Sequence, residues 1–152
     1  MRGKRIISLI CSICVIMLLW FLVFHRTWEK LQIAGTVRRD PEGLTQMAEE
    51  ILEKGNAEGY SYPGVRKITY WDGDTPGHTA WLDFFCYGFG IVPASSCKGF
   101  YYSPQDVPLG YQGSGQPLTE DGTGWSWEEE AGDHRYYTEK ICDKFYFYEM
   151  HF

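Results

Sequence analysis

The chain has 152 residues, about the length of one domain, and its 14 basic and 20 acidic side chains give a net charge of −6. Three of the basic residues precede a long uncharged segment near the N-terminus, so the rest of the chain holds 11 basic against 20 acidic side chains, a net charge of −9. This acidity excludes nucleic acid as an expected partner, because phosphate binding needs clustered Lys and Arg.

Aromatic residues dominate the C-terminal part of the sequence. The chain contains 9 Phe, 11 Tyr and 6 Trp, and most of them follow Gly59. Aromatic side chains fit the pleated, half-buried surface of a β-sheet, and the 17 glycines punctuate the same region as turn residues do. The sequence therefore predicts a β-rich domain after a helical start.

The first predicted element is a transmembrane helix over residues 6–24. The segment Ile6–Phe24 has no charged residue, and at about 1.5 Å rise per residue it covers about 28 Å, close to the hydrocarbon thickness of a bilayer. A buried helix of a soluble protein would show a polar stripe, which this segment lacks. Interfacial aromatics gather at its C-terminal end: Trp20, Phe21, Phe24 and Trp28.

A short basic tail, residues 1–5, precedes this segment and resembles the start of a secretory signal. No small-x-small cleavage site follows Phe24, which favours an uncleaved, single-pass signal anchor. Basic residues on the two sides are nearly balanced, but their density at the very start favours a cytoplasmic N-terminus. We expect a cell-membrane protein with an extracytoplasmic C-terminal domain.

Residues 25–39 form a predicted connector of mixed polarity, and a globular domain is expected over residues 40–152. The domain opens with Asp40 as an N-cap and Pro41 at the first helical position, and Gly55 supplies the stop. Between them, apolar residues recur at helical spacing: Leu44, Met47, Ala48, Ile51 and Leu52. The pattern predicts an amphipathic helix over Pro41–Lys54.

A series of strand-like segments follows, separated by Gly- and Pro-rich turns. They are expected to form an antiparallel sheet of about five to six strands, with the amphipathic helix packed on one face, which is an α+β fold. Turns and loops are predicted at Asp72–Gly77, Gly88–Ser96 and Ser103–Gly124. The predicted strands are Val65–Trp71, Thr79–Tyr87, Lys98–Ser103, Trp125–Glu128, Arg135–Ile141 and Phe145–Met150.

Alternation along these strands divides the sheet into two faces. One face is apolar and should pack on the helix, with Leu44, Ile51, Leu82, Phe84, Phe145 and Phe147 in the core. The other carries rings with polar tips and is the candidate partner-binding aromatic face: Trp81, Phe85, Tyr87, Tyr146 and Tyr148. In the alternative interpretation the loop Ser103–Gly124 folds across these rings, with Tyr111 and Leu118 capping them.

Candidate sites for chemistry are sparse. Asp72 and Asp74, with His78 and Asp83 nearby, lack the ligand spacing of a Ca²⁺ loop and are interpreted as a turn. No catalytic, metal or cofactor motif is recognisable, so no catalytic residue, metal or cofactor is predicted. Three cysteines lie in the domain, and a Cys86–Cys97 bridge would need a bulge or another register; free thiols, Cys142 included, are the simpler reading.

Three segments carry a resemblance to a known group of proteins. They are Phe89-Gly90-Ile91-Val92-Pro93, Gly99-Phe100-Tyr101-Tyr102-Ser103-Pro104 and Tyr136-Tyr137-Thr138-Glu139-Lys140-Ile141. The chain resembles small uncharacterised membrane-anchored proteins of Gram-positive, clostridia-like bacteria. The resemblance implies a bacterial envelope protein, and it implies no known activity.

Two functions remain open at this point. The first is a non-enzymatic envelope module that binds a partner protein or a wall glycan. The second is a small envelope hydrolase that uses carboxylates such as Asp72, Asp74 or Asp83 as acid and base. The first is favoured, because no group of polar residues converges in the sequence.

Overall fold

The computed structural model describes residues 2–73, 79–91 and 94–152. The predicted turn at Asp72–Gly77 therefore lies partly outside the described residues, together with Asp74 and His78. The chain divides into two units, Met1–Gln32 and Ile33–Phe152. The second unit contains the sheet and every residue considered as a site.

Helix α1 runs from Arg2 to Arg39 without interruption. Residues 2–5 of the predicted tail, the membrane segment and the connector fall within it, so residues 25–39 are helical. Ile33 and Val37 near its end are buried in the second unit. Among the described residues, no helix is long and apolar enough to cross a membrane. The membrane segment at 6–24 thus gains no support here and stays a prediction.

Helix α2 spans Pro41–Lys54, as predicted. The Asp40 side chain accepts a hydrogen bond of 3.0 Å from the Gly43 N–H and caps the first turn. Gly55 adopts a left-handed conformation with φ of 66°, and its N–H donates to the Ile51 carbonyl at 2.9 Å. Local signals alone thus fix both ends of this helix.

The sheet is antiparallel throughout and has seven strands in the order β1-β2-β3-β7-β6-β5-β4. The α+β class is confirmed, but five to six strands was an underestimate, because the short exposed strand β4 lies inside the predicted loop Ser103–Gly124. The predicted loop Gly88–Ser96 is also wrong in part, since β2 and β3 continue into it. The strands are β1 Lys67–Trp71, β2 Trp81–Ile91, β3 Ala94–Tyr102, β4 Thr119–Asp121, β5 Gly124–Glu128, β6 Arg135–Cys142 and β7 Phe145–His151.

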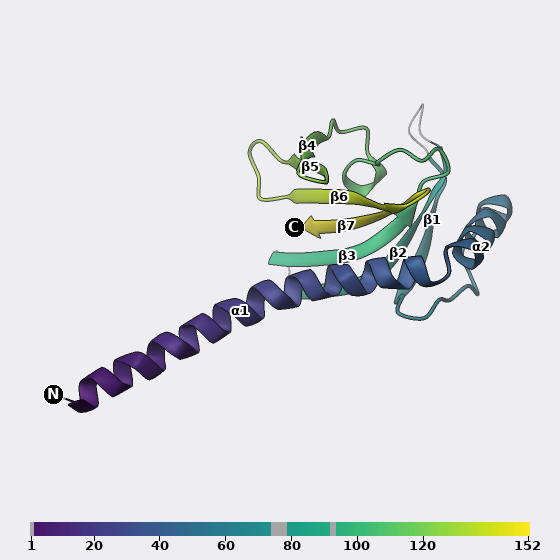
Figure 1. The fold of residues 1–152 in the computed structure, drawn as a ribbon. Coiled ribbons are helices and arrows are strands. Elements are labelled where there is room, and N and C mark those ends of the chain that lie inside the picture. The colour runs from purple at the N-terminus through teal and green to yellow at the C-terminus, as the bar shows by residue number, and fades with distance from the viewer. Residues whose placement is uncertain (1, 74–78, 92–93) are drawn as a thin grey trace. The chain divides into compact units, whose positions relative to one another are not determined.

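Strand order explains the path of the long connection between β3 and β4. Strand β7 pairs with β3 at the centre of the sheet, whereas β4 lies at the edge beyond β6 and β5. Residues 103–118, which include the 3₁₀ turn η1 Tyr111–Gly113, must therefore cross one face of the sheet. Figure 1 shows this connection, hereafter the crossing loop, on the side of the sheet opposite α2.

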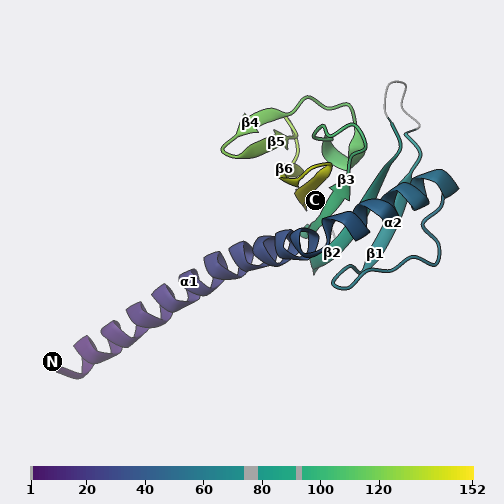
Figure 2. The same cartoon turned by 45° about the vertical axis from the view of Figure 1, so that its right-hand side comes forward.

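The face beneath the helices forms the first hydrophobic core, hereafter the helix core. Figure 2 shows α2 lying across β1 and β2. Phe84 and Phe100 stack with ring centroids 4.6 Å apart, and Phe145 packs against Phe100 edge-on at 6.2 Å. The predicted core is confirmed, since all six of its members are buried here: Leu44, Ile51, Leu82, Phe84, Phe145 and Phe147.

Candidate functional site

The opposite face of the sheet is also a core, covered by the crossing loop and hereafter called the loop core. Its buried members are Trp81, Tyr101, Tyr136, Tyr146 and Tyr148. Leu109, Tyr111 and Leu118 of the crossing loop pack against them. The prediction that Trp81, Tyr146 and Tyr148 lie exposed is therefore wrong, and the alternative, capping by Tyr111 and Leu118, describes the structure.

The other two residues of the predicted aromatic face are half-buried. Phe85 belongs to neither core and lies opposite Gly99 in the neighbouring strand. The pairing register shifts between Phe85 and Tyr87, and beyond this β-bulge Tyr87 packs against the helix core, as Cys86 does. The predicted face is thus split by the bulge. In the described part of the chain Cys86 and Cys97 are free thiols, as is Cys142.

Hydroxyl groups of the loop core bind the backbone of the crossing loop. Tyr101 Oη accepts a hydrogen bond of 2.9 Å from the Leu109 N–H. The same hydroxyl lies 2.9 Å from Thr138 Oγ1, which donates to the Phe147 carbonyl at 2.8 Å. Because the Thr138 proton is used in this way, Tyr101 must donate to Thr138. The Tyr101 hydroxyl therefore accepts from Leu109 and donates to Thr138.

Asp106 anchors the beginning of the crossing loop. Its backbone is left-handed, with φ of 54°, and its carbonyl accepts a 2.8 Å hydrogen bond from Tyr146 Oη. Its carboxylate accepts from the Lys144 N–H at 2.8 Å and pairs with Lys140 Nζ. Burial raises the pKa of Asp106, but these hydrogen bonds outweigh that effect and hold the pKa below its ordinary value.

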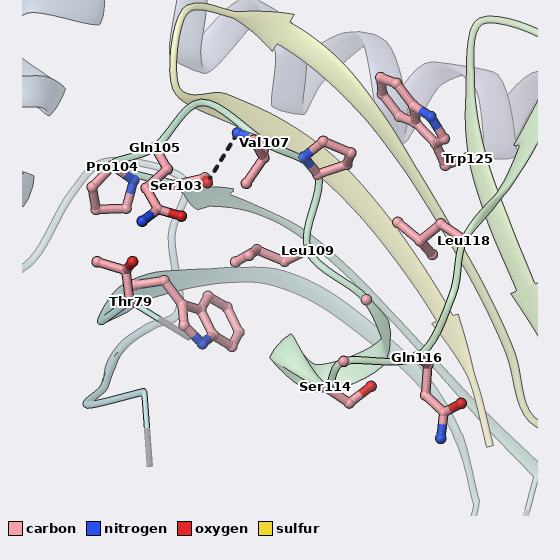
Figure 3. Close-up of a pocket in the computed structure, with 14 residues that line it drawn as sticks. Thr79, Ser103, Pro104, Gln105, Val107, Leu109, Ser114, Gln116, Leu118 and Trp125 are labelled. Atoms are coloured by element: carbon pink, nitrogen blue, oxygen red, sulfur yellow. Dashed lines mark hydrogen bonds between the residues drawn. The ribbon is translucent and has the colours of Figure 1, made fainter. Parts of the chain in front are cut away.

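A cavity of about 390 Å³ lies between the crossing loop and the sheet, hereafter the loop pocket. Figure 3 shows Thr79, Ser103 and Gln105 at one end, Gln116, Leu118 and Trp125 at the other, and Leu109 between them. Its apolar lining comprises Trp81, Pro104, Val107, Pro108, Leu109, Leu118 and Trp125. Its polar side chains are all uncharged: Thr79, Ser103, Gln105, Ser114 and Gln116.

The indole of Trp81 is held rigidly at the pocket. It stacks on Trp71 with centroids 5.6 Å apart and meets Tyr101 edge-on at 6.0 Å. The crossing loop approaches it so closely that a Cβ at Gly113, where φ is 72°, would lie 2.6 Å from the ring. Only glycine suits this position, on both steric and conformational grounds.

Ser114 is a lining residue of the pocket with a buried hydroxyl. Its Oγ has no hydrogen-bond partner among the described residues. The residue lies two positions after Gln112, whose left-handed φ of 50° is uncommon outside glycine. Strained turns and unsatisfied buried polar groups are both enriched where proteins hold ligands.

Asp83 is the carboxylate with the most unusual environment. The Tyr148 ring crosses over Gly99, where a Cβ would lie 2.8 Å from the Tyr148 hydroxyl, and that hydroxyl donates to Asp83. Burial raises the pKa of Asp83 to about 6, against the lowering effects of the Tyr148 hydrogen bond and of Lys67. Asp83 Oδ1 has no hydrogen-bond partner in the described part of the chain.

The structure brings no second carboxylate of the predicted set to Asp83. Asp72 is exposed beyond the end of β1, Asp74 lies outside the described residues, and Asp83 itself does not line the loop pocket. Within residues 2–73, 79–91 and 94–152, no group of three or more His, Cys, Asp or Glu side chains is arranged to hold a metal.

Sequence reasoning missed most of the pocket. Ser114, Gln116 and Gln105 lie in a segment without periodicity, and nothing local marks Asp106 as an anchor. The only usable signal was the pair of glycines that flank Tyr111 and Gln112, since Gly110 and Gly113 both lie where a Cβ would clash. Comparison with protein-family models, with curated proteins and with solved structures finds no match, so no family is assigned to the chain.

Proposed function

We propose that this chain is a membrane-anchored binding module of the cell envelope, without enzymatic activity, and that the loop pocket holds its ligand. The observation that carries the proposal is the cavity of about 390 Å³ with its mixed lining. Ligand sites are concave, mainly apolar and furnished with a few placed polar groups, and this volume falls within their usual range. The proposed binding site is thus the cavity between the crossing loop and the sheet, and not the exposed aromatic face that the sequence predicted.

The membrane anchor rests on the sequence of α1. Ile6–Phe24 is uncharged, the tail before it is basic, and the backbone of α1 is helical across the whole segment. A single pass would leave the domain outside the cytoplasm. Protease added to intact protoplasts should then remove the domain, whereas digestion only after permeabilisation would reverse the proposed orientation.

Hydrolysis is the weaker candidate. One observation favours it, because a carboxyl group with a pKa of about 6 is suited to proton transfer near neutral pH. The pocket itself, however, is lined by fourteen described residues of which none has an ionisable side chain. Acid–base chemistry needs a proton donor or acceptor within hydrogen-bond reach of the ligand, which this lining does not supply.

The binding proposal can be tested with the full chain in lipid nanodiscs. A mixture of small neutral ring alcohols and amides should shift the indole N–H signals of Trp81 and Trp125 in NMR spectra, since both rings line the pocket. Gly115→Phe should block these shifts by filling the cavity, because Gly115 lines it and does not have a positive φ. Thr119→Phe, at an exposed position of β4, is the matched control and should leave the shifts intact. Absence of any saturable shift would overturn the proposal.

A further inference from the structure

We infer that the ligand of the loop pocket is a neutral saccharide; this rests on the proposed function and names its ligand class. The first step concerns the charge of the side chains that line the pocket. Thr79, Ser103, Gln105, Ser114 and Gln116 supply all the polar side chains of the lining, and each is uncharged. A charged group that entered would lose its hydration without gaining an ion pair, at a large cost in free energy. The ligand is therefore neutral.

The second step concerns the hydrogen bonds that the polar side chains of the pocket can form. Hydroxyl and amide side chains both donate and accept, so they match a ligand whose own groups also do both. Sugar hydroxyls have this property, whereas a purely apolar ligand would leave the polar lining unpaired. Ser103 Oγ already accepts from the Val107 N–H at 3.3 Å, and Ser114 Oγ is buried. The exposed amide side chains of Gln105 and Gln116 are therefore assigned to ligand hydroxyls.

The third step is the apolar surface of the pocket. Trp125 lines the pocket and is partly exposed, whereas Trp81 is buried against Trp71 and Gly113. An indole offers a large flat area that loses little conformational entropy on binding. The C–H face of a pyranose ring is apolar while its edge carries hydroxyls, so one ring satisfies both parts of the lining. Figure 3 shows Thr79 and Gln105 on one side of Leu109, with Leu118 and Trp125 on the other side.

An extended peptide is the nearest competitor. Proline-rich peptides also bind surfaces with Trp and Pro, but they present mostly backbone carbonyls, which only accept hydrogen bonds. The amides of Gln105 and Gln116 could not use their acceptor atoms on such a ligand. The saccharide makes fuller use of the lining.

The test uses the full chain in nanodiscs free of glycolipid and of sugar-based detergent. Triacetylchitotriose and cellotriose are the neutral probes, chitotriose with its protonated amines is the charged comparator, and an uncharged proline-rich peptide represents the competitor. We expect at least one neutral trisaccharide to produce a saturable change in tryptophan fluorescence and in the Trp125 indole signal. Chitotriose should bind at least tenfold more weakly than triacetylchitotriose.

Gln105→Ala should weaken saccharide binding by roughly 5- to 10-fold, the effect of one lost hydrogen bond. Ser126→Ala, on β5 outside the pocket, is the control and should bind as the unmodified chain does. Equal binding of chitotriose, an unchanged affinity in Gln105→Ala, or binding of the peptide alone would overturn the saccharide inference. If the neutral alcohols and amides shift the pocket tryptophans while both trisaccharides fail, the saccharide inference falls and the binding module stands. If neither set binds, the proposed function falls as well.

Discussion

The two faces of the sheet are both buried, but they are built from different residues. The helix core beneath α2 is made largely of Leu, Ile and Phe, with Tyr102 as the one tyrosine among its buried members in the described residues. The loop core on the other face is made of Tyr and Trp, with Thr138 fully buried among them. The difference follows from what covers each face.

A helix satisfies its own backbone hydrogen bonds, so the face beneath it needs only apolar surface. A loop leaves its N–H and C=O groups free, and burying them without partners is costly. The hydroxyls of Tyr101 and Tyr146 meet this need by binding the Leu109 N–H and the Asp106 carbonyl. From the sequence, aromatic rings with polar tips predicted a solvent-exposed face. In the structure, their hydroxyls instead bind the backbone of the loop that covers them.

The strongest test of this comparison truncates one large ring on each face. Phe84→Ala and Trp81→Ala should each lower the free energy of unfolding by roughly 3–5 kcal/mol, since both side chains are buried. Phe89→Ala is the control, because its ring is 86% exposed and its loss should cost under about 0.5 kcal/mol. Urea unfolding measures all three. A control-like cost for Trp81→Ala would show that the loop face is not a core.

The second test concerns Asp83, whose carboxylate accepts a hydrogen bond from Tyr148 of the loop core. Asp83 has a pKa of about 6 when folded and about 4 when unfolded, so between these values the folded state holds more protons. Stability should therefore fall as pH rises from about 4 to about 6 and stay lower above that window. Asp83→Asn should remove this contribution and stabilise the domain at pH 8 by about 3 kcal/mol.

The matched control for this carboxylate is Asp72→Asn, at an exposed position just beyond β1. Thermal unfolding across pH 4 to 8 should give parallel curves for the control and the unmodified chain. If Asp83→Asn instead follows the same pH slope as the unmodified chain, Asp83 does not carry the effect.

The third test removes a single hydroxyl from each face. Tyr101→Phe should cost about 1–2 kcal/mol, because it leaves the partly buried Leu109 N–H without its acceptor. Tyr102→Phe removes a hydroxyl from the helix core that contacts only Glu49 and Lys144, both of them partly hydrated, and should cost about 0.5 kcal/mol. Denaturant midpoints compare the two directly, and equal costs would contradict the role given to the loop-core hydroxyls.

The smallest expected effect lies at the anchor of the crossing loop. Asp106→Asn weakens the pairing with Lys140, which is partly exposed, so the global cost should stay under about 1 kcal/mol. Its consequence should be local, with faster limited proteolysis between Val107 and Leu118. Asp143→Asn, a nearly fully exposed partner of the same lysine, should leave the cleavage rate unchanged.

Sequence reasoning succeeded where structure is decided locally. The Asp40 cap, Pro41 and Gly55 define α2, and strict alternation identifies Leu82 and Phe84 as inward-facing. It failed at the bulge beyond Phe85, since aromatic residues continue on both sides of Cys86 and no change of pattern marks the shift. Tyr87 was placed on the wrong face for that reason.

The cover over the loop core was hidden for a different reason. The crossing loop traverses this face only because β7 inserts between β3 and β6, which is a long-range pairing without local signature. The pocket depends on the same path, so Ser114 and Gln116 could not be recognised before the strand order was known. Periodicity identifies which residues share a face, but not what covers it.

The central claim is that the hydroxyls of the loop core hold the backbone of the crossing loop, and amide hydrogen exchange at Leu109 tests it most directly. The Leu109 N–H donates to Tyr101 Oη in the structure, so it should exchange slowly in the unmodified chain. In Tyr101→Phe it should exchange at least about tenfold faster, while amides of α2 keep their protection. Rapid exchange of Leu109 in the unmodified chain, or no change in Tyr101→Phe, would contradict the account.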